Sequence, residues 1–109
     1  MNKEKMFYNG FSNYETFTYN AWLNSDKNLY QEILEVIKNA YKENQNNTKI
    51  VFEICSFLDG YLSDYINRNV FGYLRDLLTP SIKKINTYEI ANNLLWNYTE
   101  NYNSEVKQA

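Results

Sequence analysis

Residues 49–67 read KIVFEICSFLDGYLSDYIN, and the apolar side chains in this stretch recur with the period of a helix. They cover more than half of the helix circumference and leave a narrow polar strip, which consists of Glu53, Ser56, Gly60, Asp64 and Asn67. The β-branched opening KIVFEIC also suits a strand, but the helical period continues past Tyr61. The stretch therefore predicts the central helix of an all-α protein.

A second amphipathic segment precedes this helix. Its apolar residues recur every three or four positions and predict a helix over about residues 26–43. The amide-rich residues 44–47 then predict a loop, because short amides compete with helical hydrogen bonds. We expect Thr48 to cap the central helix.

Pro80 predicts a break in the segment that follows the central helix. Asn69 is expected to cap a short helix that runs through Leu78. Because proline lacks an amide hydrogen and restricts the residue before it, the helix should end at Thr79. Pro80 then suits the first turn of another short helix, which runs through Ile85.

Two stretches near the ends of the chain are alike. Residues 12–25 read SNYETFTYNAWLNS and residues 86–99 read NTYEIANNLLWNYT, so both place Trp seven residues after Tyr-Glu. In each stretch a cap residue, Ser12 or Asn86, precedes Glu by three positions, which is the spacing of a capping box. We expect helices that begin at Asn13 and after Asn86, the second running to about Asn101, with each Glu reaching back to its own cap amide.

The aromatic residues of these two helices are predicted to lie in or near the core. This holds for Tyr14, Trp22, Tyr88 and Trp96, since aromatic side chains at helical spacing usually bury area. The first helix should bury one face through Tyr14, Phe17, Thr18, Ala21 and Trp22.

The length of 109 residues is enough for one hydrophobic core. We therefore predict a compact all-α bundle of about five or six helices that occupies residues 1–109 as a single domain. Flexible ends are expected at about residues 1–10 and 103–109.

The first of the repeated stretches resembles a family of small bacteriophage and plasmid proteins. In that family a Gly-(x2)-Asn-Tyr-Glu-Thr-Trp-type motif leads to a further Trp, as in GFSNYETFTYNAWLNSD here, with Phe17 at the position of the first Trp. FGYLRDLLTPSIKKINTYEIANNLL is similar to the second signature of the family. The resemblance implies a helical accessory protein of a mobile element, and small proteins in that setting include anti-CRISPR proteins.

Charge and cysteine content favour some classes of protein over others. The formal charge of −2 and the pI of about 5.1 lack the basic excess typical of nucleic-acid binding, so direct nucleic-acid binding is disfavoured. A small nucleic-acid-binding or regulatory helical protein is the alternative, because Lys83 and Lys84 precede a segment that resembles the second helix of a helix-turn-helix. One cysteine and no long apolar run indicate the host cytoplasm and no membrane contact.

The residues that most enzymes need are missing from this sequence. There is no His, and Cys55 lies in an apolar stretch, so we predict no catalytic residue, no metal site and no cofactor. The three glycines form no phosphate-binding loop. The protein is not expected to be an enzyme.

Tyrosine is more abundant than one small core requires, with 11 Tyr beside 6 Phe and 2 Trp. Some of these rings should be exposed, and tyrosine is enriched at interfaces. Together with exposed carboxylates, among them Glu32 and Glu35, they favour stoichiometric binding to a host protein or a CRISPR effector complex with a basic groove. The oligomeric state is not specified. The predicted partner-binding residues are Glu53, Asp59, Asp64, Asp76, Tyr61 and Tyr73.

Overall fold

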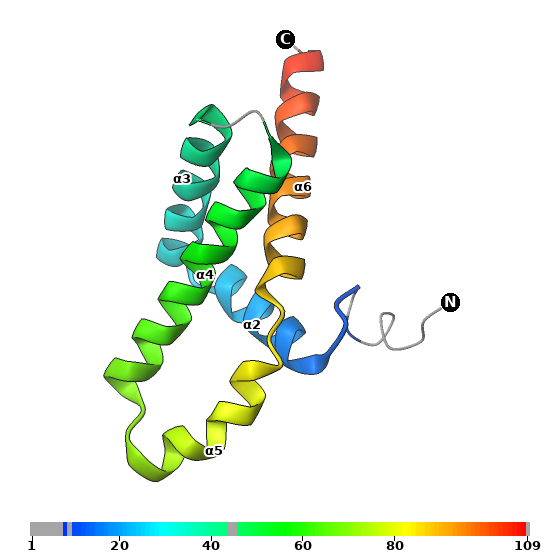
Figure 1. The fold of residues 1–109 in the computed structure, drawn as a ribbon. Helices are drawn as coiled ribbons and strands as arrows, with labels where there is room; N and C mark the ends of the chain where they lie inside the picture. The colour runs from blue at the N-terminus through cyan, green and yellow to red at the C-terminus, as the bar shows by residue number, and fades with distance from the viewer. Residues whose placement is uncertain (1–7, 9, 44–45, 109) are drawn as a thin grey trace.

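The apolar stripes form helices in the computed structural model, which describes residues 8, 10–43 and 46–108. Over these residues the chain contains five helices and no strand, and it forms a single all-α bundle, as predicted (Figure 1). The helices are α2 (Tyr14–Ser25), α3 (Lys27–Glu43), α4 (Asn47–Asn69), α5 (Gly72–Lys83) and α6 (Thr87–Gln108).

The core lies between α3, α4 and α6. Helix α4 packs against both α3 and α6, while α2 crosses the lower part of the bundle and contacts α3 and α6 (Figure 1). The predicted central helix is therefore central. Its inward residues and those of its neighbours form one cluster, which includes Ile33, Ile37, Ile50, Ile54, Leu58, Ile90 and Leu94.

Helices α3 and α4 start on side-chain caps. The Asp26 carboxylate accepts a hydrogen bond from the Leu29 amide at 3.0 Å and fixes the start of α3. Asn46, and not the predicted Thr48, caps α4, because its side-chain oxygen accepts from the Thr48 amide at 2.8 Å. Residues 44 and 45 of the predicted loop lie outside the described residues.

Helix α5 contradicts the predicted break at Pro80. The chain forms one helix from Gly72 to Lys83 with Pro80 inside it, and Asn69 donates to the Tyr65 carbonyl instead of capping α5. Proline removes one hydrogen bond from a helix but does not always end it. Pro80 is exposed on α5.

Helix α6 begins as predicted and ends later. The Asn86 side-chain oxygen accepts from the Glu89 amide at 3.2 Å, which confirms the cap. The helix continues past Asn101 to Gln108. The flexible ends stay a prediction, and residues 1–7, 9 and 109 lie outside the described residues.

The face that α2 buries differs from the predicted one. Thr16, Tyr19 and Leu23 are its buried residues, and Trp22 is half-buried beside them. The prediction that both tryptophans and both tyrosines of the repeated stretches lie in or near the core is wrong for the three that are exposed. These are Tyr14, Tyr88 and Trp96.

The starts of α2 and α6 contact each other, and this contact replaces the predicted capping boxes. Asn13 caps α2 in place of Ser12, and the Ser12 amide and hydroxyl both donate to the Glu89 carboxylate at 3.0 Å. In return the Asn86 amide donates to the Thr16 hydroxyl at 2.9 Å. We call these five residues, which connect the two repeated stretches, the helix-start junction.

Candidate functional site

The six predicted partner-binding residues lie in three places. Glu53, Tyr61 and Asp64 are separated by eight and three residues, so they share one side of α4. Asp59 lies on a different side of α4, facing α6. Tyr73 and Asp76 are exposed on α5. The structure therefore brings three of the six together.

An aromatic cluster surrounds Tyr61. The Trp22 ring lies with its centroid 5.8 Å from the Tyr61 ring and 5.2 Å from the Tyr65 ring, which it meets edge-on. Phe57 extends the cluster along α4, and Tyr19 stacks on the other side of Trp22. Rings at these distances attract one another beyond the area they bury, so Tyr61 is held in a defined position.

Two carboxylates, one on α3 and one at its N-cap, act electrostatically on the Tyr61 hydroxyl. Partial burial raises the pKa of Tyr61, and the negative charges of Asp26 and Glu32 raise this pKa further. Both carboxylates therefore lie close enough to α4 to act on this ring. We call the combined surface the acidic aromatic face: Trp22, Asp26, Glu32, Glu53, Tyr61, Asp64 and Tyr65.

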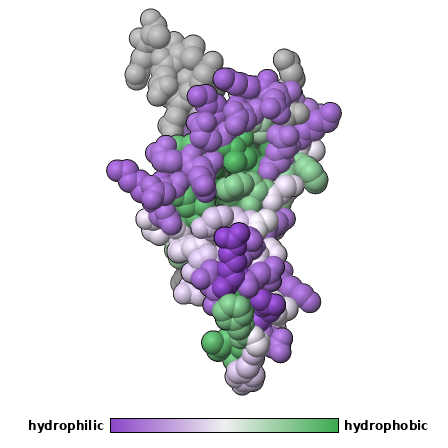
Figure 2. Space-filling view, turned by 90° about the vertical axis from the view of Figure 1, so that its left-hand side faces the viewer, coloured by the Kyte–Doolittle hydropathy of each residue, from purple (hydrophilic) through white to green (hydrophobic). Residues whose placement is uncertain are grey.

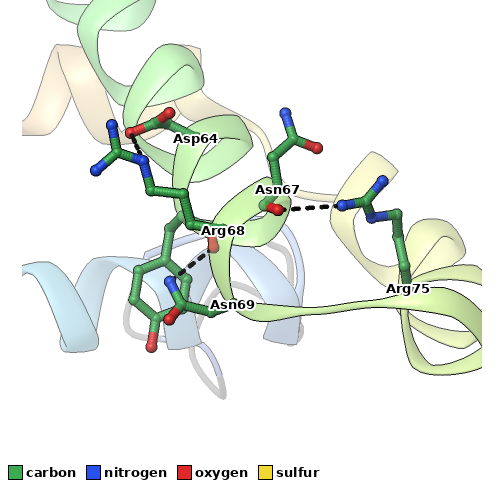
Figure 3. A network of polar contacts seen from close by, with 6 residues as sticks. Asp64, Asn67, Arg68, Asn69 and Arg75 are labelled. Carbon is green, nitrogen blue, oxygen red and sulfur yellow. Dashed lines mark hydrogen bonds and ion pairs between the residues drawn. The ribbon is translucent and has the colours of Figure 1, made fainter.

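Asp64 does not present an isolated negative charge. Its carboxylate lies 3.2 Å from the Arg68 guanidinium one turn later, and both side chains are exposed (Figure 3). An exposed pair of this kind contributes little to stability, because water and salt screen it. Asp64 thus remains accessible to a partner that offers a better-placed cation.

Arg75 connects α5 to the end of α4 in the same region. Its guanidinium donates to the carbonyl of Asn67 at 3.3 Å (Figure 3). It also donates to the carbonyl of Val70 at 3.2 Å. These carbonyls belong to the last turn of α4 and to its C-cap, where no helical amide follows to satisfy them. Arg75 is therefore engaged in holding the α4–α5 turn.

Asp59 has a structural partner. The Thr87 hydroxyl donates to its carboxylate at 2.7 Å, and the Cys55 sulfur lies 3.1 Å from the same hydroxyl oxygen. Since a hydroxyl has a single proton, the Cys55 thiol is the donor in the second contact. This chain of bonds joins α4 to the first residue of α6.

The charge of α4's second half and α5 is not acidic. Between residues 59 and 84 the sequence has three carboxylates and four basic side chains. What distinguishes α5 is its apolar surface, since Tyr73 and four other large apolar residues there are exposed. The acidic aromatic face and α5 are therefore two surfaces of different chemistry.

Comparison with known proteins gives no relative: no family model, no curated protein and no solved structure matches this chain. Within the described residues, no three His, Cys, Asp or Glu side chains form a group that could hold a metal ion. None of the described helices is long and apolar enough to cross a membrane.

Asp26, Trp22 and Tyr65 belong to this surface but are absent from the predicted set. The sequence predicts Trp22 in or near the core and Asp26 only at the start of a helix. The antiparallel arrangement of α3 and α4 places the start of α3 beside the second half of α4 (Figure 1). Counting residues outward from the loop at 44–47 would have paired these positions.

Proposed function

We propose that this protein is a mobile-element protein that acts by stoichiometric binding to a host protein or ribonucleoprotein. Its target is a nucleic-acid-targeting defence complex, which it inhibits as an anti-CRISPR-type protein. The observation that carries this proposal is the cluster of the Trp22, Tyr61 and Tyr65 rings, with Asp64 three residues after Tyr61 on α4 and with the charges of Asp26 and Glu32 raising the pKa of Tyr61. The resemblance of the two repeated stretches to phage and plasmid proteins supports the setting.

The proposed inhibition needs no chemical step. A defence complex holds nucleic acid through Lys and Arg side chains in a basic groove, and carboxylates of the acidic aromatic face compete for those cations. Tyr61 and Tyr65 supply the aromatic contacts that dominate many interfaces once water is excluded. Charge thus determines the partner, and the rings supply much of the affinity.

Charge reversal on this face tests the proposal. Glu32→Lys and Asp64→Lys lie on different helices, and neither side chain caps a helix. We expect the double variant to lower affinity for the target about 100-fold, since each desolvated charge contact is worth about 1.5 kcal/mol or more. Glu100→Lys, which reverses one charge on α6, is the matched control for each single reversal and should bind normally.

The target itself is found by affinity purification from the native host followed by mass spectrometry. The expected result is recovery of a nucleic-acid-targeting effector subunit with the wild-type protein and its loss with the double variant. Unimpaired interference in cells that express the protein, together with recovery of no effector subunit, would contradict the proposal. Steep weakening of direct nucleic-acid binding by salt would instead favour the nucleic-acid-binding alternative.

A further inference from the structure

Helix α5 leaves a large apolar surface uncovered. It has no buried residue and makes no extensive contact with another helix in the described part of the chain. Figure 2 shows hydrophobic residues at the lower tip of the molecule, the end that the α4–α5 turn forms in Figure 1. Five large apolar side chains on α5 and its N-cap are between 42% and 75% exposed: Phe71, Tyr73, Leu74, Leu77 and Leu78.

The exposed leucines form one uncharged face. Leu74, Leu77 and Leu78 are spaced i, i+3 and i+4, which is the spacing that packs against another helix. Asp76 and Lys83 lie on the opposite side of α5 by the same periodicity. A face without charge has no carboxylate that could pair with the cations of a basic groove, and it does not repel a second copy of itself.

An apolar cavity lies at the other end of this face. It has a volume of about 360 Å³ and is lined by α2, by the C-terminal part of α5 and by Ile85 just beyond it; Glu15 is the one charged residue of a lining that also includes Tyr14, Trp22, Ser81 and Ile82. Ser81 continues the face of Leu74 and Leu78, because the three are four and three residues apart. The face thus has large apolar side chains at its N-terminal end and a cavity at its C-terminal end.

We propose that a second copy of this chain packs antiparallel across α5. With a two-fold axis between Leu77 and Leu78, Leu74 of each copy opposes the small Ser81 of the other. Phe71 of each copy then lies at the cavity of the other. Such an interface is isologous, since the same patch serves both partners. Leu74 therefore packs against Ser81 at two symmetry-related places. In each, a large side chain fills the space beside a small one, as in ridges-into-grooves packing.

The available area agrees with a dimer. The five exposed side chains present about 600 Å² in total, taking about 150–250 Å² for a fully exposed residue of this size. A standard interface buries about 800 Å² on each partner. The exposed ring of Tyr14 and the other walls of the cavity supply the remainder.

The oligomeric state of the whole protein tests this inference. Light scattering after gel filtration should give twice the monomer mass of 13.1 kDa for the wild type. Phe71→Glu and Leu74→Glu should each raise the dimer dissociation constant about 100-fold or more, since each puts a charge into the apolar contact. Phe52→Glu makes the same change at a side chain that is 70% exposed on α4, and this variant should remain a dimer.

Cross-linking tests the antiparallel register. In a Cys55→Ala background, Leu74→Cys combined with Ser81→Cys should give a disulfide-linked dimer on mild oxidation, whereas Phe52→Cys should not. A wild type that stays monomeric at every soluble concentration would overturn the inference, and so would a dimer that survives both glutamate variants. The inference does not rest on the proposed function, because these variants change no residue of the acidic aromatic face, although Trp22 belongs both to that face and to the wall of the cavity.

Discussion

Residues 12–25 and residues 86–99 share the same spacing of Tyr, Glu and Trp, yet their tryptophans lie in different surroundings. Trp22 is half-buried among the rings of Tyr61 and Tyr65, whereas Trp96 is 63% exposed on the outer side of α6. Both stretches start a helix on an asparagine cap. The cap lies directly before Tyr14 in the first stretch but two residues before Tyr88 in the second, so the shared spacing does not determine the first residue of each helix, and the neighbouring helices determine which face is buried.

The first contrast to test is the loss of each tryptophan ring. Trp22→Ala should lower the free energy of unfolding by about 2–3 kcal/mol, less than for a fully buried Trp because the ring is only half-buried. Trp96→Ala should change it by no more than about 0.5 kcal/mol. Urea unfolding of the two variants measures both values. Equal losses of unfolding free energy would contradict the different burial of the two rings.

The helix-start junction gives the next contrast. Thr16 is fully buried, and its hydroxyl accepts from the Asn86 amide, so Thr16→Val keeps the shape of the side chain and removes the acceptor. We expect the free energy of unfolding to fall by about 1–2 kcal/mol, because the Asn86 amide is left without an acceptor. Thr18→Val, on the exposed side of α2, is the matched control. Similar stability of the two variants would contradict a role for this bond.

Tyr19 distinguishes the first stretch from the second, which has Asn93 at the matching position. Its hydroxyl donates to the Leu58 carbonyl at 2.9 Å, and Tyr19→Phe should cost about 1 kcal/mol near neutral pH. Burial, with smaller effects of Tyr61 and Asp59, raises the pKa of this hydroxyl far above its usual value.

Because the pKa of Tyr19 is raised in the folded protein, the contribution of Tyr19 to stability depends on pH. At alkaline pH the unfolded chain loses the Tyr19 proton that the folded protein keeps. The stability that this hydroxyl contributes is therefore complete below the unfolded pKa of about 10 and is lost as pH rises above it. Thermal unfolding at a series of pH values should therefore show a shallower alkaline decline for Tyr19→Phe than for the wild type. Tyr88→Phe, which changes an exposed ring, should leave the decline unchanged.

The smallest contrast is between the two asparagine caps. Asn13→Ala removes the cap of α2 and also a donor to the Lys84 carbonyl at 2.8 Å, so it should cost about 1–2 kcal/mol. Asn86→Ala removes only a cap bond of 3.2 Å and should cost about 0.5–1 kcal/mol. Denaturant unfolding measures both losses of stability. A larger loss for Asn86→Ala than for Asn13→Ala would mean that the Lys84 contact contributes nothing to stability.

The sequence predicted those helices whose faces are set by their own apolar residues. The stripes of α3 and α4 are continuous, so the positions of Ile33, Ile37, Ile54 and Leu58 in the core follow from periodicity alone. The buried face of α2 did not follow. It is centred on Thr16, a polar residue that can be buried only because Asn86 bonds to it from another helix.

The capping-box error also comes from a contact between distant segments, whereas the error at Pro80 is local. Glu89 has the spacing of a capping box, but Ser12 offers it two donors from the other end of the chain. Pro80 is a typical helix breaker, yet one missing hydrogen bond does not end an exposed helix. Part of the candidate surface was predicted through Glu53, Tyr61 and Asp64, which share one side of α4. Asp26 joins them only through the antiparallel packing of α3 on α4.

The helix-start junction also has a consequence for the kinetics of folding. Ser12 and Glu89 are 77 residues apart in sequence, and the entropy cost of closing a loop grows with its length. We therefore expect local pairs such as α3 and α4 to form first and the junction to form after the transition state. Contacts made that late slow unfolding without accelerating folding. Loss of the junction should therefore raise the unfolding rate and leave the folding rate unchanged, whereas loss of an α3–α4 contact should lower the folding rate.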